Sequence, residues 1–328
     1  MNIDIYGFRE PPFQMTPDAR RFFPSTVHSR AYAHLLFGLS QREGFIVVTG
    51  EVGAGKTTLI ERLCAEIVPK GHAVARVMTT QVEAEDLLRL VAVAFGADAR
   101  GSKAEILRSI VARLWEGISE RGQRHVLIVD EAQALPVGAL EELRMLSNVT
   151  EGEHALLQVI LMGQPQLRRT LGRPDLDQLR QRILAAFHLA GLTREETHLY
   201  VRHRMNSAGW AGHPAWEDGA LDLVHQFSAG IPRRINRLCA RVLLAGSLEH
   251  AAVLSKELVT ETAEELEQDL GVICAQEDQP PPSEDMTTAL RGLTERIGVL
   301  EQAVDRRERM LRRLQDLVDQ VTEARARP

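Results

Sequence analysis

The chain has 328 residues, of which 44% are hydrophobic and 26% are charged, as is typical of a globular protein with about two domains. Its formal net charge of −6 excludes an overall basic surface, so nucleic acid is a possible but disfavoured partner. The three cysteines lack the spacing of a zinc site or a disulfide framework, and a reducing, cytoplasmic environment is expected. The first residues do not form a signal peptide and no apolar run reaches the roughly 20 residues that span a bilayer, so we expect no direct membrane insertion.

The predicted elements begin with an arm, residues 1–25, whose aromatic residues and prolines are expected to be ordered against the main domain. A helix is predicted at Ser29–Glu43. Short apolar, β-rich runs then alternate with helical patterns, which indicates an α/β domain with a mostly parallel sheet. The predicted strands are Phe45–Thr49, His72–Met78, His125–Val129, Leu156–Met162 and Ala185–Leu189. The predicted helices among them are Lys56–Val68, two between Val82 and Arg121, and Val137–Asn148.

The second half of the chain has a different pattern. Only helical patterns follow from Thr193 to about Leu270, and the proline run Pro280–Pro282 then indicates a linker. Apolar heptads from Leu290 to Val321, broken only at Arg307, favour a coiled coil, and a single docked amphipathic helix is the alternative. The predicted domains are 1–190 (the α/β domain with its arm), 191–270 (helical), 271–285 (linker) and 286–328 (coiled coil).

Residues 50–57 match the whole phosphate-binding loop pattern G-x-x-x-x-G-K-[ST] and lie between a predicted strand and a predicted helix. Its glycines let successive N–H groups point at phosphate oxygens, and the helix N-terminus adds partial positive charge. We expect Lys56 to reach the β- and γ-phosphates of ATP, and the Thr57 hydroxyl to bind Mg²⁺. The predicted nucleotide-binding residues are Gly50, Glu51, Val52, Gly53, Ala54, Gly55, Lys56, Thr57 and Thr58.

Asp130 and Glu131 end a buried strand, where adjacent carboxylates are costly unless they meet a cation or solvent. In a P-loop protein, Asp130 would hold Mg²⁺ through water, and Glu131 would act on the attacking water as a general base. A solvated strand end is the alternative. Gln164 follows the fourth strand and could sense the γ-phosphate or position water, although Gly163-Gln164-Pro165 also suits a simple turn.

Three arginines are further candidates for contact with the γ-phosphate. Arg180 and Arg182 precede the fifth strand, and one of them could act in trans as an arginine finger. A surface helix with ion pairs is the alternative. Arg233 lies near a predicted helix start, where its charge opposes the helix dipole, which favours a functional role at the γ-phosphate.

Together these segments resemble the ExeA-like ATPases, also called general secretion pathway protein A, over roughly residues 1–270. The resemblance rests on YGFREPPFQMTPDARRFF, TGEVGAGKTTL, LIVDEAQ, LEELRMLSN, LMGQPQL, LRQRI and GIPRRINRLC. It implies an AAA+ fold whose phosphate-loop strand is central in the sheet, with a helical lid. It also implies that Gln164 and Arg233 are the first and second sensors, and that Arg180 or Arg182 is the finger.

The resemblance implies a role in secretion, pilus or exopolysaccharide loci. Secretion-type members often carry a transmembrane segment and a peptidoglycan-binding region, where this chain has heptads instead. We therefore expect a self-associating, Mg²⁺-dependent ATPase that assembles or regulates a protein partner in envelope or polysaccharide machinery. A DNA-associated transposition helper and a non-catalytic scaffold are the alternatives. The acidic balance disfavours the first, and the complete set of hydrolytic residues disfavours the second.

Overall fold

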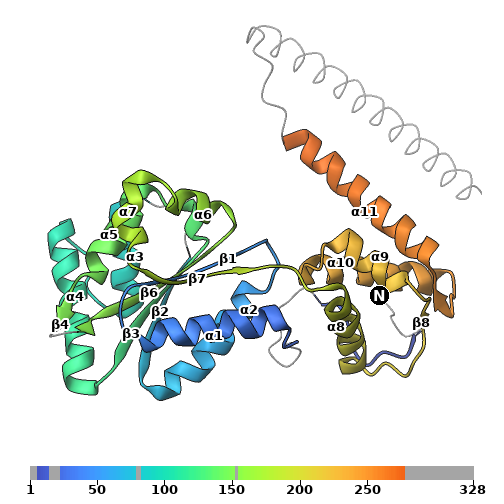
Figure 1. Cartoon of the computed structure of the whole chain (residues 1–328), viewed down its shortest axis with the longest axis horizontal. Helices are drawn as coiled ribbons and strands as arrows, with labels where there is room; N and C mark the ends of the chain where they lie inside the picture. The colour runs from blue at the N-terminus through green and yellow to red at the C-terminus, as the bar shows by residue number, and fades with distance from the viewer. Residues whose placement is uncertain (1–5, 15–22, 79–82, 152–153, 278–328) are drawn as a thin grey trace, which may run out of the picture. The chain divides into compact units, whose positions relative to one another are not determined.

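The computed structural model describes residues 6–14, 23–78, 83–151 and 154–277 (Figure 1). Met1–Leu266 form one compact unit, and a second unit begins at Glu267. The predicted coiled coil lies outside the described residues. The predicted linker from residue 271 is in part wrong, because helix α11 (Lys256–Glu277) continues past that point. The prolines of the predicted linker, Pro280–Pro282, follow the end of α11 in the sequence.

The first unit is built on a five-stranded sheet in which every neighbouring pair is parallel, with the order β2-β3-β6-β1-β7. All five predicted strands are confirmed to within two residues. Strand β1 carries the phosphate loop and is interior, as the resemblance implied, although β6 is the middle strand. The strands are β1 (Phe45–Gly50), β2 (His72–Met78), β3 (Arg124–Asp130), β6 (Leu157–Gly163) and β7 (Ile183–Leu189).

Helices cover both faces of this sheet (Figure 1). The alternation of side chains along β1 divides two hydrophobic cores, because Ile46 and Val48 face one side and Phe45 and Val47 face the other. Helices α1 (Thr26–Ser40) and α2 (Lys56–Ile67) pack on the first core. Helices α3 (Ala84–Phe95), α4 (Lys103–Arg121) and α5 (Val137–Ser147) pack on the second. Both faces being covered explains why every residue of β1 and β6 is buried.

The predicted helices of this part are confirmed, with one shift. Helix α1 begins at Thr26, three residues earlier than predicted, because the Ser25 side chain accepts a hydrogen bond from the His28 N–H and caps the helix. The shorter elements are η3 (Val68–Lys70), η4 (Ala132–Ala134), β4 (Thr150–Glu151), β5 (His154–Ala155), α6 (Gln166–Leu171), η5 (Pro174–Leu176) and α7 (Asp177–Arg180).

The remaining described helices share a third hydrophobic core. They are α8 (Arg194–Ser207), α9 (Ala220–Ser228), α10 (Pro232–Leu248) and α11. The expectation of helices alone is wrong in one detail, since β8 (Ala215–Trp216) and β9 (Val253–Leu254) form a short parallel pair. A domain boundary near residue 190 and a lid role for these helices stay predictions. Nowhere in the described ranges is a helix both long and apolar enough to cross a bilayer.

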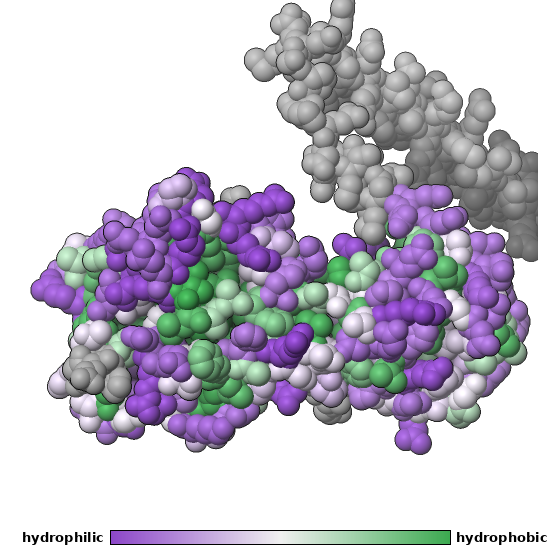
Figure 2. All heavy atoms as spheres, viewed as in Figure 1, coloured by the Kyte–Doolittle hydropathy of each residue, from purple (hydrophilic) through white to green (hydrophobic). Residues whose placement is uncertain are grey.

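The described part of the amino-terminal arm packs on this helical core. Tyr6, Phe8 and Phe13 are buried there, and the Arg204 guanidinium donates to the Pro12 carbonyl at 2.9 Å. The boundaries predicted from the sequence group the arm with the α/β part, whereas these residues pack on the helices that follow it. Helices already cover both sheet faces, so the aromatic side chains are buried between helices instead. Hydrophilic side chains predominate on the face shown in Figure 2. This is expected because many apolar side chains are buried in the three hydrophobic cores.

We expect the buried His125 of β3 to make the stability of the fold depend on pH. Burial, and then the nearby Arg113 and Arg121, lower the pKa of His125 from 6.5 to about 4. Because the folded pKa lies below the unfolded one, the stability that neutral His125 contributes is present above about pH 6.5 and is lost as pH falls towards 4. His125→Gln should therefore reduce the loss of unfolding free energy between pH 7 and 4.5 by about 2 kcal/mol.

Urea unfolding at several pH values measures this difference. His250→Gln, at an exposed position, is the control for the loss of a histidine. Equal slopes for wild type and His125→Gln would contradict the prediction.

Candidate functional site

The loop between β1 and α2 curls through two left-handed glycines. Gly53 and Gly55 have φ values of +82° and +97°, which side-chain-bearing residues rarely adopt. Between them, the Ala54 N–H donates to the Glu51 carbonyl at 3.1 Å and closes the turn. The backbone geometry therefore requires glycine at position 55 of the motif, and also at position 53, which the motif leaves open.

Lys56 begins α2 and its side chain is buried inside this loop. Its ammonium donates to the carbonyl oxygens of Gly50 at 2.6 Å and Glu51 at 3.0 Å. Burial lowers the pKa of Lys56, while the carboxylates of Glu131 and Asp130 oppose that shift. The ammonium is thus placed where it can bind a phosphate oxygen.

The strand register brings Asp130 and Glu131 to the edge of the sheet from which the phosphate loop leaves β1. The carboxyl ends of β1, β6 and β3 are aligned, and Asp130 is the last residue of β3. Burial raises the pKa of Asp130, and the Glu131 charge adds to this, although the Glu131 N–H donates to Asp130 at 2.9 Å and acts the other way. A half-buried carboxylate pair of this kind is stabilised by a cation.

Gln164 meets Glu131 at this edge. Its side-chain amide donates to Glu131 Oε2 at 3.2 Å. Glu131 itself is in the left-handed region, with φ +51°. The structure therefore brings together Lys56, Asp130, Glu131 and Gln164, which the sequence predicted as parts of one site.

His28 was not among the predicted site residues, but its side chain contacts the phosphate loop from helix α1. Its ring lies between the Ser25 hydroxyl, 2.7 Å from Nδ1, and the Ala54 carbonyl, 3.1 Å from Nε2. A Cβ atom on Gly55 would come within 2.5 Å of Nε2. Burial lowers the pKa of His28, so the neutral ring is favoured. Nothing in the local sequence distinguishes this histidine from a surface one.

Arg233 of α10 touches the same loop from the helical part. Its backbone N–H donates to the Gly53 carbonyl at 3.2 Å, and a Cβ atom on Gly53 would lie 2.2 Å from Arg233 Cβ. The side chain is exposed, and no ion pair with another described residue holds it. This position is compatible with the predicted sensor role, which stays a prediction.

Arg180 and Arg182 lie at the opposite edge of the sheet from the phosphate loop. Strand β7 runs parallel to β1 with Ile183 beside Phe45, so both arginines precede the amino end of the sheet. Arg180 forms an exposed ion pair with Asp177 at 2.8 Å. The six residues of β1 span roughly 20 Å. These arginines therefore lie too far along the sheet to reach a phosphate held by their own loop, and the finger role stays a prediction.

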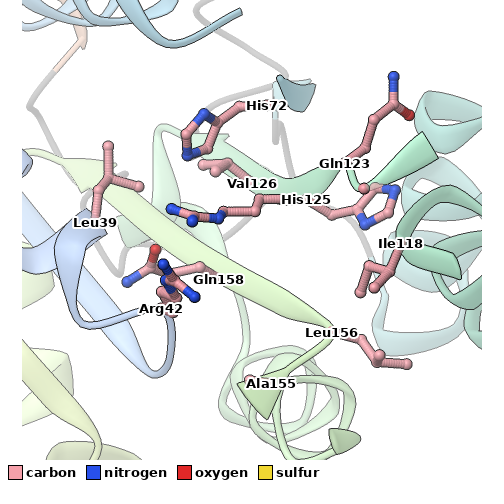
Figure 3. A pocket seen from close by; sticks show the side chains of 12 residues that line it. Leu39, Arg42, His72, Ile118, Gln123, His125, Val126, Ala155, Leu156 and Gln158 are labelled. Atoms are coloured by element: carbon pink, nitrogen blue, oxygen red, sulfur yellow. The ribbon is translucent and has the colours of Figure 1, made fainter. Parts of the chain in front are cut away.

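A cavity of about 270 Å³ also opens at this amino-terminal edge (Figure 3). Two of its polar lining side chains serve the fold. The Gln158 amide donates to the carbonyls of Gly38 and Glu43 at 2.7 and 2.8 Å, and His72 Nδ1 lies 3.1 Å from the Ile67 carbonyl. The cavity contains none of the predicted site residues, so it is distinct from the phosphate loop.

The residues at the loop fit a magnesium ion better than a transition metal. Within the described ranges, no group of three or more His, Cys, Asp or Glu side chains could hold a metal. Mg²⁺ commonly uses one or two protein oxygens and completes its shell with phosphate oxygens and water. The Thr57 hydroxyl, exposed at the start of α2, and the Asp130 carboxylate supply such oxygens.

Comparison with known proteins agrees with this geometry. Residues 39–171 match a family model described as an AAA domain. Solved structures with the same fold include the Aeropyrum pernix ORC1 protein in complex with DNA (TM-score 0.57, 17% identity, 80% of this chain and 70% of that chain). Another is Cdc6p from Pyrobaculum aerophilum (TM-score 0.56, 17% identity, 76% of this chain and 71% of that chain). The protein therefore has the fold of an AAA+ P-loop NTPase.

A relative among curated proteins is General secretion pathway protein A of Aeromonas hydrophila. It is 38% identical over 246 residues, which are 75% of this chain and 45% of that protein. This match confirms the resemblance to the ExeA-like ATPases that the motifs indicated. The present chain spans less than half the length of this relative.

The contact between Gly53 and Arg233 can be tested by one substitution. Gly53→Ala would place a methyl group 2.2 Å from Arg233 Cβ and should push α10 away from the loop. We expect ATP affinity to fall at least tenfold, about 1.4 kcal/mol, because the loop can no longer close around phosphate. Titration of a fluorescent ATP analogue measures this.

Gly71→Ala is the matched control. Gly71 has a similar φ of +87°, but a Cβ atom there would meet nothing within 4 Å. It should destabilise the fold slightly and leave affinity unchanged. Equal affinities for the two variants would show that the contact has no bearing on binding.

Proposed function

We propose that this protein binds Mg²⁺·ATP and hydrolyses it in order to assemble or regulate a protein partner. The main support is the convergence of Lys56, Asp130, Glu131 and Gln164 beside the glycine loop. A scaffold protein would gain nothing from placing a buried lysine and two half-buried carboxylates at one sheet edge, since charged groups are costly to remove from water.

The residues divide the work by chemistry. Backbone N–H groups of the loop and the Lys56 ammonium would bind phosphate oxygens. Thr57 and Asp130 would hold Mg²⁺, which neutralises phosphate charge when bound. A Glu131 carboxylate oxygen would accept the proton of the attacking water, and Gln164 would orient that water or sense the γ-phosphate. Arg233 would contact the γ-phosphate and so connect it to helix α10 of the helical part.

The class of protein partner is proposed from the name of the curated relative. The curated relative is named for the general secretion pathway, which supports a partner in secretion, pilus or exopolysaccharide machinery. We place this work in the cytoplasm, where ATP is available. The location of Arg180 and Arg182 at the opposite sheet edge supports self-association, because an arginine finger there needs a second copy of the chain.

Two substitutions separate binding from hydrolysis. Lys56→Ala should remove nucleotide binding, because the main side-chain cation for the phosphates is lost. Glu131→Gln should keep ATP binding but reduce turnover by about 10²–10⁴, because an amide cannot accept the water proton. Phosphate release and equilibrium nucleotide binding are the measurements.

Lys70→Ala is the control for loss of a lysine, since Lys70 is exposed and pairs only with Glu66 at 2.7 Å among the described residues. It should bind and hydrolyse ATP like wild type. Turnover of Glu131→Gln within threefold of wild type would place the base elsewhere, and unchanged affinity of Lys56→Ala would disprove the nucleotide site.

Mixing variants tests the finger in trans. Lys56→Ala and Arg180→Ala/Arg182→Ala should each be inactive alone, and their mixture should partly recover turnover, because each supplies what the other lacks. Turnover per subunit of wild type should also rise with protein concentration. Steady-state phosphate release and light scattering measure the two effects.

Arg173→Ala is the control, because Arg173 is an exposed arginine paired with Asp175 at 2.9 Å. It should remain active without mixing. A wild-type monomer at all concentrations with ATP, together with an inactive mixture, would show that each chain acts alone.

A further inference from the structure

Gln133 lies in the short turn η4, immediately after the acidic pair, and its side-chain amide makes two hydrogen bonds. Its Nε2 donates to Glu131 Oε2 at 2.5 Å, and its Oε1 accepts from the Gln164 backbone N–H at 2.9 Å. The amide therefore connects the end of β3 to the end of β6. Gln133 was not among the predicted site residues.

The end of β6 is shaped to admit this amide. A Cβ atom on Gly163 would lie 2.7 Å from Gln133 Oε1 and 3.3 Å from the Gln133 backbone nitrogen. Only glycine at position 163 leaves Gln133 where it is. The left-handed backbone of Glu131, φ +51° and ψ +36°, sets the turn that lets the two side chains meet.

The contacts form a closed ring of three residues. Glu131 Oε2 accepts from the side chains of both Gln133 and Gln164, and Gln133 in turn accepts from the backbone of Gln164. Two donors on one carboxylate oxygen restrict the rotation of the carboxylate. A movement of Gln164 would thus be transmitted to Glu131 by two routes.

We propose that Gln133 is a positioning residue that holds the Glu131 carboxylate in the orientation needed to accept a proton from the attacking water. This rests on the ATP hydrolysis proposed above. The role requires a glutamine, because one side chain must donate to Glu131 and accept from Gln164 at once. Glutamate lacks the donor, methionine lacks both groups, and asparagine is one methylene shorter.

Gln133→Met keeps the length of the side chain and removes both hydrogen bonds. We expect kcat to fall about 10- to 100-fold, as for small misplacements of a catalytic group. ATP affinity should stay within twofold of wild type, because the hydrogen bonds of the Gln133 side chain to described residues run to Glu131 and Gln164, not to Lys56 or to the loop. Single-turnover hydrolysis and nucleotide titration measure the two quantities.

A double variant distinguishes positioning from a general structural role. If Gln133 acts through Glu131, then Glu131→Gln/Gln133→Met should hydrolyse ATP no more slowly than Glu131→Gln alone. A structural defect would instead add its full factor to the loss. Thermal unfolding of each variant checks that the fold is retained.

Gly163→Ala gives a second test that leaves Gln133 in the sequence. The added methyl should displace the Gln133 amide and lower kcat with little change in affinity. Gly138→Ala is the control, since its Cβ atom would make only an ordinary contact, 3.9 Å from Ala84. It should have wild-type kcat.

The outcomes are separable. A wild type that hydrolyses ATP together with a Gln133→Met kcat within threefold of it would overturn the positioning role alone. A full additional loss in the double variant would do the same. A wild type that binds ATP and never hydrolyses it would overturn the proposed function, and this inference with it.

Discussion

A buried ammonium group needs hydrogen-bond acceptors and nearby negative charge, and Lys56 has both. The carbonyls of Gly50 and Glu51 surround it, and Glu131 and Asp130 lie close enough to oppose the lowering of its pKa by burial. The loop can wrap around the ammonium only because its glycines adopt left-handed backbone conformations. The rest of the site is arranged about this one charge.

The supports of the loop come from distant parts of the chain. His28 of α1 contacts the Ala54 carbonyl from one side, and the start of α10 contacts Gly53 from another. Glu196 adds a link between α8 and α1, because its carboxylate accepts from the Thr26 N–H at 2.6 Å. The loop therefore contacts both the α/β part and the helical part, and the proposed ATP-driven switch would use these contacts to transmit a movement of the loop.

The two edges of the sheet have different tasks in this arrangement. The carboxyl edge gathers Lys56, Asp130, Glu131 and Gln164, since parallel strands end together there. The amino edge presents Arg180 and Arg182 instead. A site that needs a cation from the opposite edge can be completed only by a second copy, which links the proposed chemistry to the proposed self-association.

Local sequence patterns are enough to predict the five strands, the phosphate loop and the acidic pair. These patterns are an apolar run of strand length, glycines at fixed spacing, and carboxylates at a strand end. They did not reveal His28, whose role depends on α1 packing beneath Gly55. Nor did they reveal Gln133, whose direction follows from the backbone of Glu131. The aromatic residues of the arm indicated burial but not the place of burial, and only tertiary packing put Tyr6, Phe8 and Phe13 among the helices. Contacts between residues far apart in sequence, such as Gly53 with Arg233, leave no local pattern, because they form only when the folded chain brings the two residues together.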